Sequence, residues 1–365
     1  MTSFTEKNYD KISLEDFYDG MFVNAEIYYY VNGKYVLAFK NSTINSSILS
    51  KLRGLEKLYG GLYVLSGESQ GFIELLSAQA EKRQYNELVE EHDRIIGATC
   101  SLYDEALKTN KVDLESSEKI AINLKNNLYT VKAANIIQII SGVRNSDQYL
   151  FSHSKNVAIL NGLMGKWMGL SDNDIERLIK IGLLHDIGKI RMPNEIINKP
   201  GKLTSAEFDI MKVHPVFSHE MAKASGECDE DILRAIRGHH EKTNGTGYPD
   251  RLQANELNLF TKITTISDIY DAMVAKRVYK DAHSPFEILS ELSQDKFSNL
   301  DTCLINIFLK NMPSELSGKN VLLSDGRTGK IVYINSNKLA FPFVQVENEV
   351  IETSEKLKCL SLVTV

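Results

Sequence analysis

The stretch LLHDIGKI, residues 183–190, decides the fold of this chain. An apolar helix ends here in an adjacent histidine and aspartate, and a glycine and a lysine follow. We predict that His185 and Asp186 lie together on the last turns of the helix. Lys189 follows His185 by four residues and is predicted to share nearly the same face. Around this point the sequence pattern stays helical and is interrupted only by loops rich in proline and glycine. This pattern predicts an all-α domain built around a polar site.

Four further segments place histidine or aspartate where a helix would turn inward. His153 begins an apolar stripe at helical spacing, and His214 stands in MKVHP. His239 and His240 end a helix whose inward positions are four residues apart. Asp268 lies in the apolar helix ITTISDIYDAM, where an unpaired carboxylate would be costly to bury. These side chains are therefore predicted to meet at one site.

The combined set mixes imidazole and carboxylate groups, which suit iron, manganese, zinc or nickel and are a poor cage for calcium. Seven ligands suit two ions with open positions for water and substrate. Asp186 can bridge two ions about 3.5–4 Å apart, and a bridging hydroxide can then attack phosphorus in line. The predicted ligands are His153, His185, Asp186, His214, His239, His240 and Asp268.

Three cationic side chains and one aromatic ring are candidates for substrate contact. Lys189, Arg277 and Lys280 offer charge for phosphate oxygens. Tyr248, in the loop NGTGYP, is suited to stack on a base or to contact a phosphate oxygen. Arg277 and Lys280 could instead form a solvated helix face, and Tyr248 could instead only pack its loop.

A histidine on an apolar helix face is, taken singly, more often a core residue than a ligand. Five candidate histidines within residues 153–240, in a chain with eight histidines in all, make that explanation weak for the set. His92 and Asp93 also form a His-Asp pair, but without companion histidines they are interpreted as helix surface. Asp271 is expected to brace the site rather than to bind metal.

Composition limits the kinds of partner and the surroundings of the chain. The net charge of −6 argues against a surface that binds a DNA or RNA polymer, which needs a basic face. No apolar run approaches the ~18 residues of a membrane span, and the first residues lack the features of a secretory signal, so we expect a cytoplasmic protein. The four cysteines are isolated, and neither disulfides nor cysteine-bound zinc are expected.

The chain divides by pattern into four parts. Residues 1–70 predict a small α/β module with a hairpin at Asn32-Gly33 and a loop-like break at 66–71. Residues 71–145 predict a helical connector, which either packs on the next domain or acts in signal relay or homodimer contact. Residues 146–315 form the all-α domain. Residues 316–365 predict a small β subdomain, so the fold class is mainly α.

The segments HDIGK, HHE and GYP, with MKVHP and ISDIYDAMVAKRVYK, resemble the HD-GYP family within the HD phosphohydrolase superfamily. The resemblance spans about residues 147–292. It implies the seven metal ligands above with Asp186 bridging, iron or manganese as the metal, and hydrolysis of cyclic di-GMP to linear pGpG, and often onward to GMP. Family members with three metals have an additional glutamate where this chain has Tyr149, which favours two metals.

We therefore expect a metal-dependent cyclic dinucleotide phosphodiesterase in which Asp186 and Lys189 serve the reaction and Lys189, Tyr248, Arg277 and Lys280 bind substrate. Two alternatives stay open. One is a phosphohydrolase for another substrate, such as cyclic GMP-AMP or a nucleotide monophosphate. The other is a cyclic di-GMP receptor with slow turnover that signals through the connector.

Overall fold

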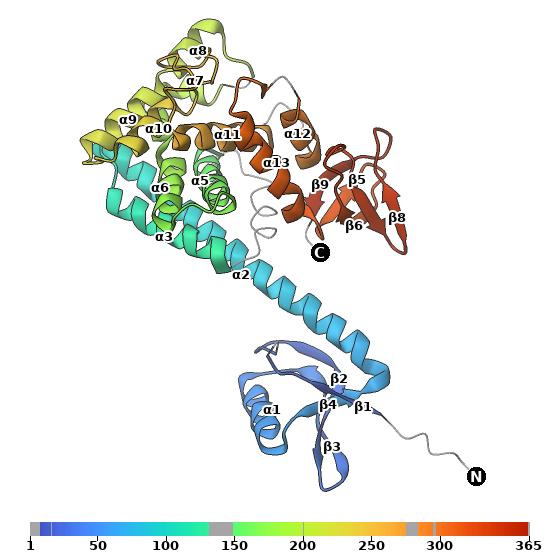
Figure 1. The fold of residues 1–365 in the computed structure, drawn as a ribbon. Coiled ribbons are helices and arrows are strands. Elements are labelled where there is room, and N and C mark those ends of the chain that lie inside the picture. Colours follow the sequence, from blue (N-terminus) through green and yellow to red (C-terminus); the bar gives the residue numbers. More distant parts are fainter. Residues whose placement is uncertain are drawn as a thin grey trace. The chain divides into compact units, whose positions relative to one another are not determined.

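The computed structural model describes residues 8–15, 17–130, 149–199, 201–274, 284–294 and 297–363. The chain forms two compact units, Met1–Val89 and Glu90–Val365, shown in Figure 1. Each unit has a hydrophobic core of its own, and each is described by itself.

The first unit is an antiparallel sheet with one helix. The strand order is β1-β4-β2-β3, and the predicted hairpin is confirmed, because β2 pairs with β3 around Asn32 and Gly33, both with positive φ. Val23, Ile27, Leu52 and Leu62 are buried between sheet and helix. The elements are β1 (Tyr9–Ile12), β2 (Phe22–Val31), β3 (Lys34–Thr43), α1 (Ser46–Tyr59) and β4 (Leu62–Leu65).

A single helix, α2 (Ser66–Thr109), begins in the first unit and ends in the second. The predicted loop-like break at residues 66–71 is therefore wrong. Glycine lowers helix propensity by about 1 kcal/mol but does not by itself end a helix, and Ser66 leaves β4 directly into the helix. The backbone N–H of Ser66 donates to the carbonyl of Asn8. Neither α2 nor any other helix within the described residues combines the length and the apolar character of a membrane span.

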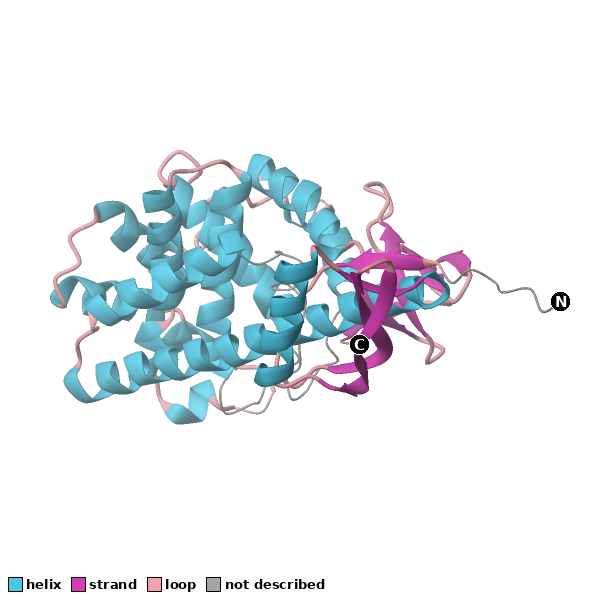
Figure 2. Cartoon of the chain, turned by 90° about the horizontal axis from the view of Figure 1, so that it is seen from below, coloured by secondary structure: helices cyan, strands magenta, loops and turns pink. Residues whose placement is uncertain are grey.

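The second unit is mainly helical, as predicted, and its helices pack side by side in both views (Figures 1 and 2). Its central pair is α5 and α6, and the other helices surround them. The helices are α3 (Leu114–Thr130), α5 (Tyr149–Trp167), α6 (Asp172–Leu184), η2 (Ile187–Arg191), α7 (Asn194–Ile197), α8 (Ser205–Met211), α9 (His214–Ala224), α10 (Glu230–Gly238), α11 (Leu259–Val274), α12 (Pro285–Leu292) and α13 (Thr302–Leu316).

The close approach of α5 and α6 depends on Gly182. A Cβ atom at this position would lie 2.3 Å from the Cα of Ala158 on α5, a distance that no side chain tolerates. The two helix backbones therefore touch near the end of α6, one turn before His185. The contact brings His153 of α5 close to His185, with ring centroids 5.3 Å apart. A packing requirement thus positions the site.

A five-stranded antiparallel sheet follows α13, in the order β8-β7-β6-β5-β9. Its inward residues Val321, Leu323, Ile331 and Val344 are fully buried and belong to the same hydrophobic cluster as the helices. The tail therefore extends the helical core. The strands are β5 (Asn320–Leu323), β6 (Thr328–Tyr333), β7 (Phe343–Val346), β8 (Glu349–Glu352) and β9 (Cys359–Val363).

We predict that Gly182→Ala destabilises the protein by about 1–3 kcal/mol, because the added methyl group overlaps the α5 backbone. Urea denaturation measures this change. Gly97→Ala is the matched control: Gly97 lies in α2 with open space around it, and alanine should there be neutral or stabilising by up to about 1 kcal/mol. Equal stability of the two variants would contradict the close α5–α6 contact.

Candidate metal centre

All seven predicted ligands lie together in the second unit. They form two groups, in each of which one donor atom per residue lies within 4.8 Å of the others. The ligands come from α5, from the end of α6, from the start of α9, from the end of α10 and from α11, so segments more than 100 residues apart in the chain meet here. The first group is Asp186, His214, His239 and His240, and the second is His153, His185 and Asp268.

Asp186 lies between the two groups and presents one oxygen to each. Its Oδ1 is 3.1 Å from Nε2 of His214 and 3.8 Å from Nε2 of His239. Its Oδ2 is 3.4 Å from Nε2 of His153 and 3.4 Å from Nε2 of His185. A carboxylate with this placement can ligate an ion on each side.

Three of the histidines are oriented by the same local device. The Nδ1 atoms of His185, His214 and His239 lie 2.7–2.8 Å from the carbonyl oxygens of the residues three positions earlier, which are Gly182, Met211 and Ile236. A carbonyl can only accept, so Nδ1 carries the proton and Nε2 has a free lone pair. Each Nε2 points toward Asp186, as a metal ligand would.

His153 is oriented by a side chain. Its Nδ1 lies 2.8 Å from Oδ2 of Asp271, whose other oxygen accepts a hydrogen bond from Nδ2 of Asn156 at 3.1 Å. His153 Nε2 is then directed at Asp268 Oδ1, 3.0 Å away. Asp271 therefore braces the site, in the role expected from its position three residues after Asp268.

The histidines of the centre differ in the direction in which their pKa values are shifted. Burial lowers the pKa of His214 and His239 and lowers that of His240 to about 3, so their imidazoles are neutral and can ligate. Burial also disfavours the charged form of His153, but Asp186, Asp268 and Asp271 outweigh it and raise its pKa. An ion that binds next to His153 must displace this proton.

The donor set fits a pair of transition metal ions. Within the part of the chain that the structure describes, His185 Nε2 and Asp186 Oδ1 are buried without a hydrogen-bond partner, which is costly unless a ligand satisfies them. His214 Nε2 lies 3.3 Å from His239 Nε2 and 3.2 Å from His240 Nε2. Two nitrogen donors at about 2.0–2.1 Å from one ion lie roughly 3 Å apart, so these separations suit shared coordination.

The predicted substrate contacts are only partly within the described residues. Lys189 lies on η2, and its ammonium group pairs with the carboxylate of Asp186. The chain after Asp186 tightens into a 3₁₀ turn, so Lys189 and His185 do not share the face of one α-helix as predicted. The ring of Tyr248 lies over that of His240, with centroids 4.7 Å apart. Arg277 and Lys280 lie outside the described residues.

Glu241, which the sequence analysis did not single out, holds the loop that carries Tyr248. Its Oε1 accepts from the backbone N–H groups of Asp250 and Arg251, at 2.7 and 2.9 Å, and its Oε2 accepts from that of Leu252 at 3.1 Å. Gly247 packs directly on the Glu241 backbone, where a Cβ atom would lie 2.4 Å from Cα. Glycine and glutamate thus fix the loop against the two histidines.

The C-terminal half of α2 reaches the metal centre through Tyr103. The buried hydroxyl of Tyr103 lies 2.7 Å from Oγ of Ser154, which follows His153, and donates to the carbonyl of Leu183 at 3.0 Å. The interpretation of His92 as helix surface is wrong, because its ring is half-buried and contacts Nζ of the buried Lys155 on α5.

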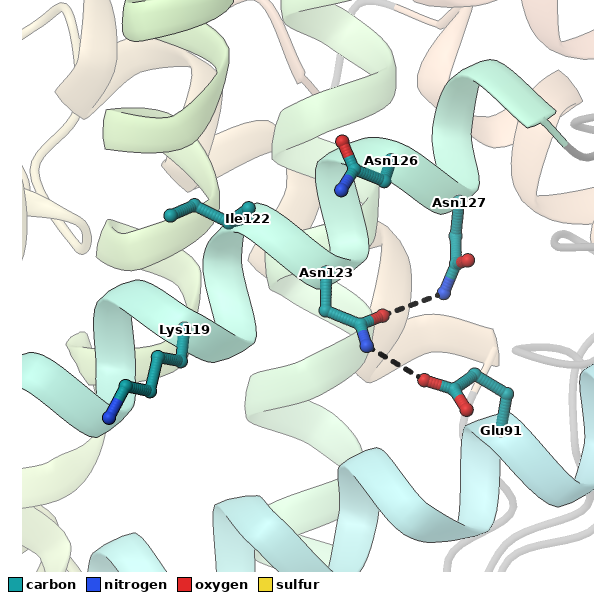
Figure 3. Close-up of a pocket in the computed structure, with 6 residues that line it drawn as sticks. All are labelled: Glu91, Lys119, Ile122, Asn123, Asn126 and Asn127. Atoms are coloured by element: carbon teal, nitrogen blue, oxygen red, sulfur yellow. Dashed lines mark hydrogen bonds between the residues drawn. The ribbon is translucent and has the colours of Figure 1, made fainter.

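Figure 3 shows a pocket of a different kind between α2 and α3. Asn123 Nδ2 donates to Glu91 at 2.9 Å, and Asn127 Nδ2 donates to Asn123 at 3.0 Å. Lys119, Ile122 and Asn126 complete the lining. The pocket contains none of the metal-ligand candidates.

Comparison with known proteins agrees with this geometry. Residues 137–304 match the family model described as HD domain. Similar proteins include a cyclic di-GMP phosphodiesterase of Pseudomonas aeruginosa, 27% identical over 69% of this chain and 60% of its own length. A 3′3′-cGAMP-specific phosphodiesterase of Vibrio cholerae is 30% identical over 52% of this chain and 37% of its own length.

A solved structure supports the fold. An HDG"Y"P protein from Bdellovibrio bacteriovorus aligns with a TM-score of 0.51 at 18% identity, covering 84% of this chain and 99% of its own. The alignment supports the fold of the helical domain, and the family match and the relatives agree with the resemblance predicted from sequence. The chain covers 60% or less of the length of the two relatives named above.

We predict that Glu241→Gln loosens the Tyr248 loop and lowers stability by about 1–3 kcal/mol, because an amide NH₂ replaces one acceptor oxygen and faces backbone N–H donors. Thermal unfolding measures the loss. Glu256→Gln is the control in the same loop region, since Glu256 accepts from only one backbone N–H, that of Gln253, and is exposed. An unchanged melting temperature for Glu241→Gln would remove the bracing role.

Proposed function

We propose that this protein is a metal-dependent phosphodiesterase that hydrolyses cyclic di-GMP to linear pGpG. The observation that carries the proposal is the buried carboxylate of Asp186 between two groups of ligands. A structural metal site has no need of a bridging acid, whereas two ions close together suit in-line displacement at phosphorus. Matched relatives named as cyclic di-GMP phosphodiesterases supply the substrate class.

The seven ligands would hold two divalent transition metal ions, and we propose iron or manganese. When bound, such ions polarise the phosphate and lower the pKa of water toward about 7. The protein's part is to hold Nε2 lone pairs and carboxylate oxygens in place before substrate arrives. The four Nδ1 contacts described above fix the orientation of these rings in advance, and His153 gives up its proton when an ion binds.

Lys189 and Tyr248 are proposed to contact the substrate beside the ions. Burial favours the neutral amine of Lys189, but the charges of Asp186 and Asp268 outweigh this effect, so the pKa of Lys189 is raised. The ammonium group therefore persists and can steady a phosphate oxygen. Burial and the same two carboxylates raise the pKa of Tyr248, so its hydroxyl stays protonated and donates. Arg277 and Lys280 are proposed as further phosphate contacts.

Tyr149 bears on the number of metals and on the product. Its ring stacks on that of His153, with centroids 5.9 Å apart and planes within 10°. A stacked phenol offers no carboxylate for a third ion. We therefore propose a two-metal centre whose main product is the linear dinucleotide.

A second candidate substrate is 3′3′-cGAMP, because three matched relatives from Vibrio cholerae carry that specificity in their names. The two molecules differ in one base and share the cyclic phosphodiester ring. The metal centre would act on the phosphodiester ring that both molecules share, so contacts with the bases would determine which substrate is preferred.

The decisive experiment incubates protein purified without oxygen with cyclic di-GMP and with 3′3′-cGAMP, and counts the metals in the same preparation. We expect about two transition metal ions per chain and pGpG as the main product from cyclic di-GMP. Preferential cleavage of 3′3′-cGAMP would move the function to the second candidate. Two bound ions without turnover of either molecule would contradict the proposed enzymatic activity and favour the alternative of a cyclic dinucleotide receptor.

We predict that Asp186→Asn lowers activity by more than about 100-fold and lowers the bound metal in proportion. The reason is that loss of a residue in direct contact with the metal costs more than loss of a residue that supports such a ligand. Elemental analysis and product formation are measured on one sample. Asp174→Asn, at the exposed start of α6, is the matched control and should leave both values unchanged. Full activity of Asp186→Asn with metal absent would exclude the two-metal mechanism.

A further inference from the structure

The short helix α8 presents an exposed aromatic ring at the edge of the metal centre. Phe208 is 44% exposed, and no residue of α8 is buried. The ring of Phe208 meets that of Tyr248 edge to face, with centroids 6.1 Å apart and planes at 83°. A single exposed phenylalanine is ordinary on a protein surface, and Phe208 is distinguished by its contact with Tyr248.

Phe208 is the outer member of a row of rings that starts at a metal-ligand candidate. The ring of Tyr248 lies 4.7 Å from that of His240, and the ring of Phe208 lies 6.1 Å from that of Tyr248. The same helix leads along the chain, through Lys212 and Val213, to His214. Phe208 is therefore tied to the centre both through packed rings and through the backbone.

The helix that carries Phe208 is held rigid despite its exposure. Thr204 and Glu207 form a complete capping box at its start. Both carboxylate oxygens of Glu207 also contact Nζ of Lys199. A ring on a helix fixed in this way is oriented before a ligand arrives, which lowers the entropy cost of binding.

Charge beside the ring matches an anionic aromatic ligand. Nζ of Lys212 lies over the ring of Phe208, 4.9 Å from its centroid, and pairs with Asp209 at 2.7 Å. A ring with an adjacent ammonium group offers a stacking surface and an attraction for phosphate in one place. Nucleotides carry both features.

We propose that Phe208 stacks on a nucleobase of the substrate while the phosphodiester lies at the metal centre. This inference rests on the proposed function and adds to it a base subsite on α8, outside the predicted substrate contacts. Cyclic di-GMP has two purine bases, and a ring beyond Tyr248 extends the binding surface away from the phosphate. Phe208 thus contributes to substrate affinity and takes no part in the chemical step.

The test compares wild type, Phe208→Ala, Phe208→Trp and Ile210→Ala, with kcat and KM measured for cyclic di-GMP and for bis(4-nitrophenyl) phosphate, a phosphodiester without a nucleobase. Ile210 is the matched control, since it lies on the same helix and is also 44% exposed. We expect Phe208→Ala to raise KM for cyclic di-GMP about 5- to 100-fold with kcat within twofold, as loss of one base–aromatic stack implies. Phe208→Trp should restore KM.

Kinetics with the small phosphodiester should be unchanged in all variants. An unchanged KM for cyclic di-GMP in Phe208→Ala would overturn the inference. So would an equal loss toward both substrates, because Phe208 would then support the metal centre itself. If wild type cleaves bis(4-nitrophenyl) phosphate but no cyclic dinucleotide, the proposed function fails and the base subsite fails with it.

Discussion

The buried carboxylate of Asp186 is the constraint on which the second unit depends. Its side chain is 1% exposed, and a charge removed from water in this way costs several kcal/mol unless partners compensate it. Burial would raise its pKa, but Lys189, His185 and His153 outweigh burial and hold the pKa well below its usual range. The carboxylate stays ionised because several helices place imidazole or ammonium groups around it.

This requirement explains why the surrounding helices end where they do. His185 and His239 cap the C-termini of α6 and α10, and His214 is the first residue of α9. At a helix end a side chain can turn back to a carbonyl three residues earlier, as all three do. Helix boundaries thus supply both the position and the tautomer of these three histidines, and the packing of Gly182 and Gly188 brings the ends together. A Cβ atom at Gly188 would lie 2.3 Å from the carbonyl oxygen of His214.

How much of this was visible in the sequence differs from one feature to another. Histidine and aspartate on apolar helix faces are unusual enough that seven candidate ligands could be named, and the structure brings these seven side chains together. The Asn32-Gly33 hairpin follows from local turn geometry. Glu241 was missed because its partners are backbone N–H groups nine to eleven residues later, and no periodicity encodes such a contact. His92 was misjudged because its contact with Lys155 depends on tertiary packing. Residues 66–71 were misjudged because glycine lowers helix propensity without by itself ending a helix.

The continuity of α2 has a consequence for how such chains can be divided. One helix carries both the last residues of the first unit and Tyr103, whose hydroxyl contacts Ser154 beside His153 and the carbonyl of Leu183, two residues before His185. A fragment cut at residue 137, where the match to the family model begins, would lose this buried contact beside the metal-ligand candidates. The part of the chain on which the site depends therefore begins earlier than the part that the family model matches.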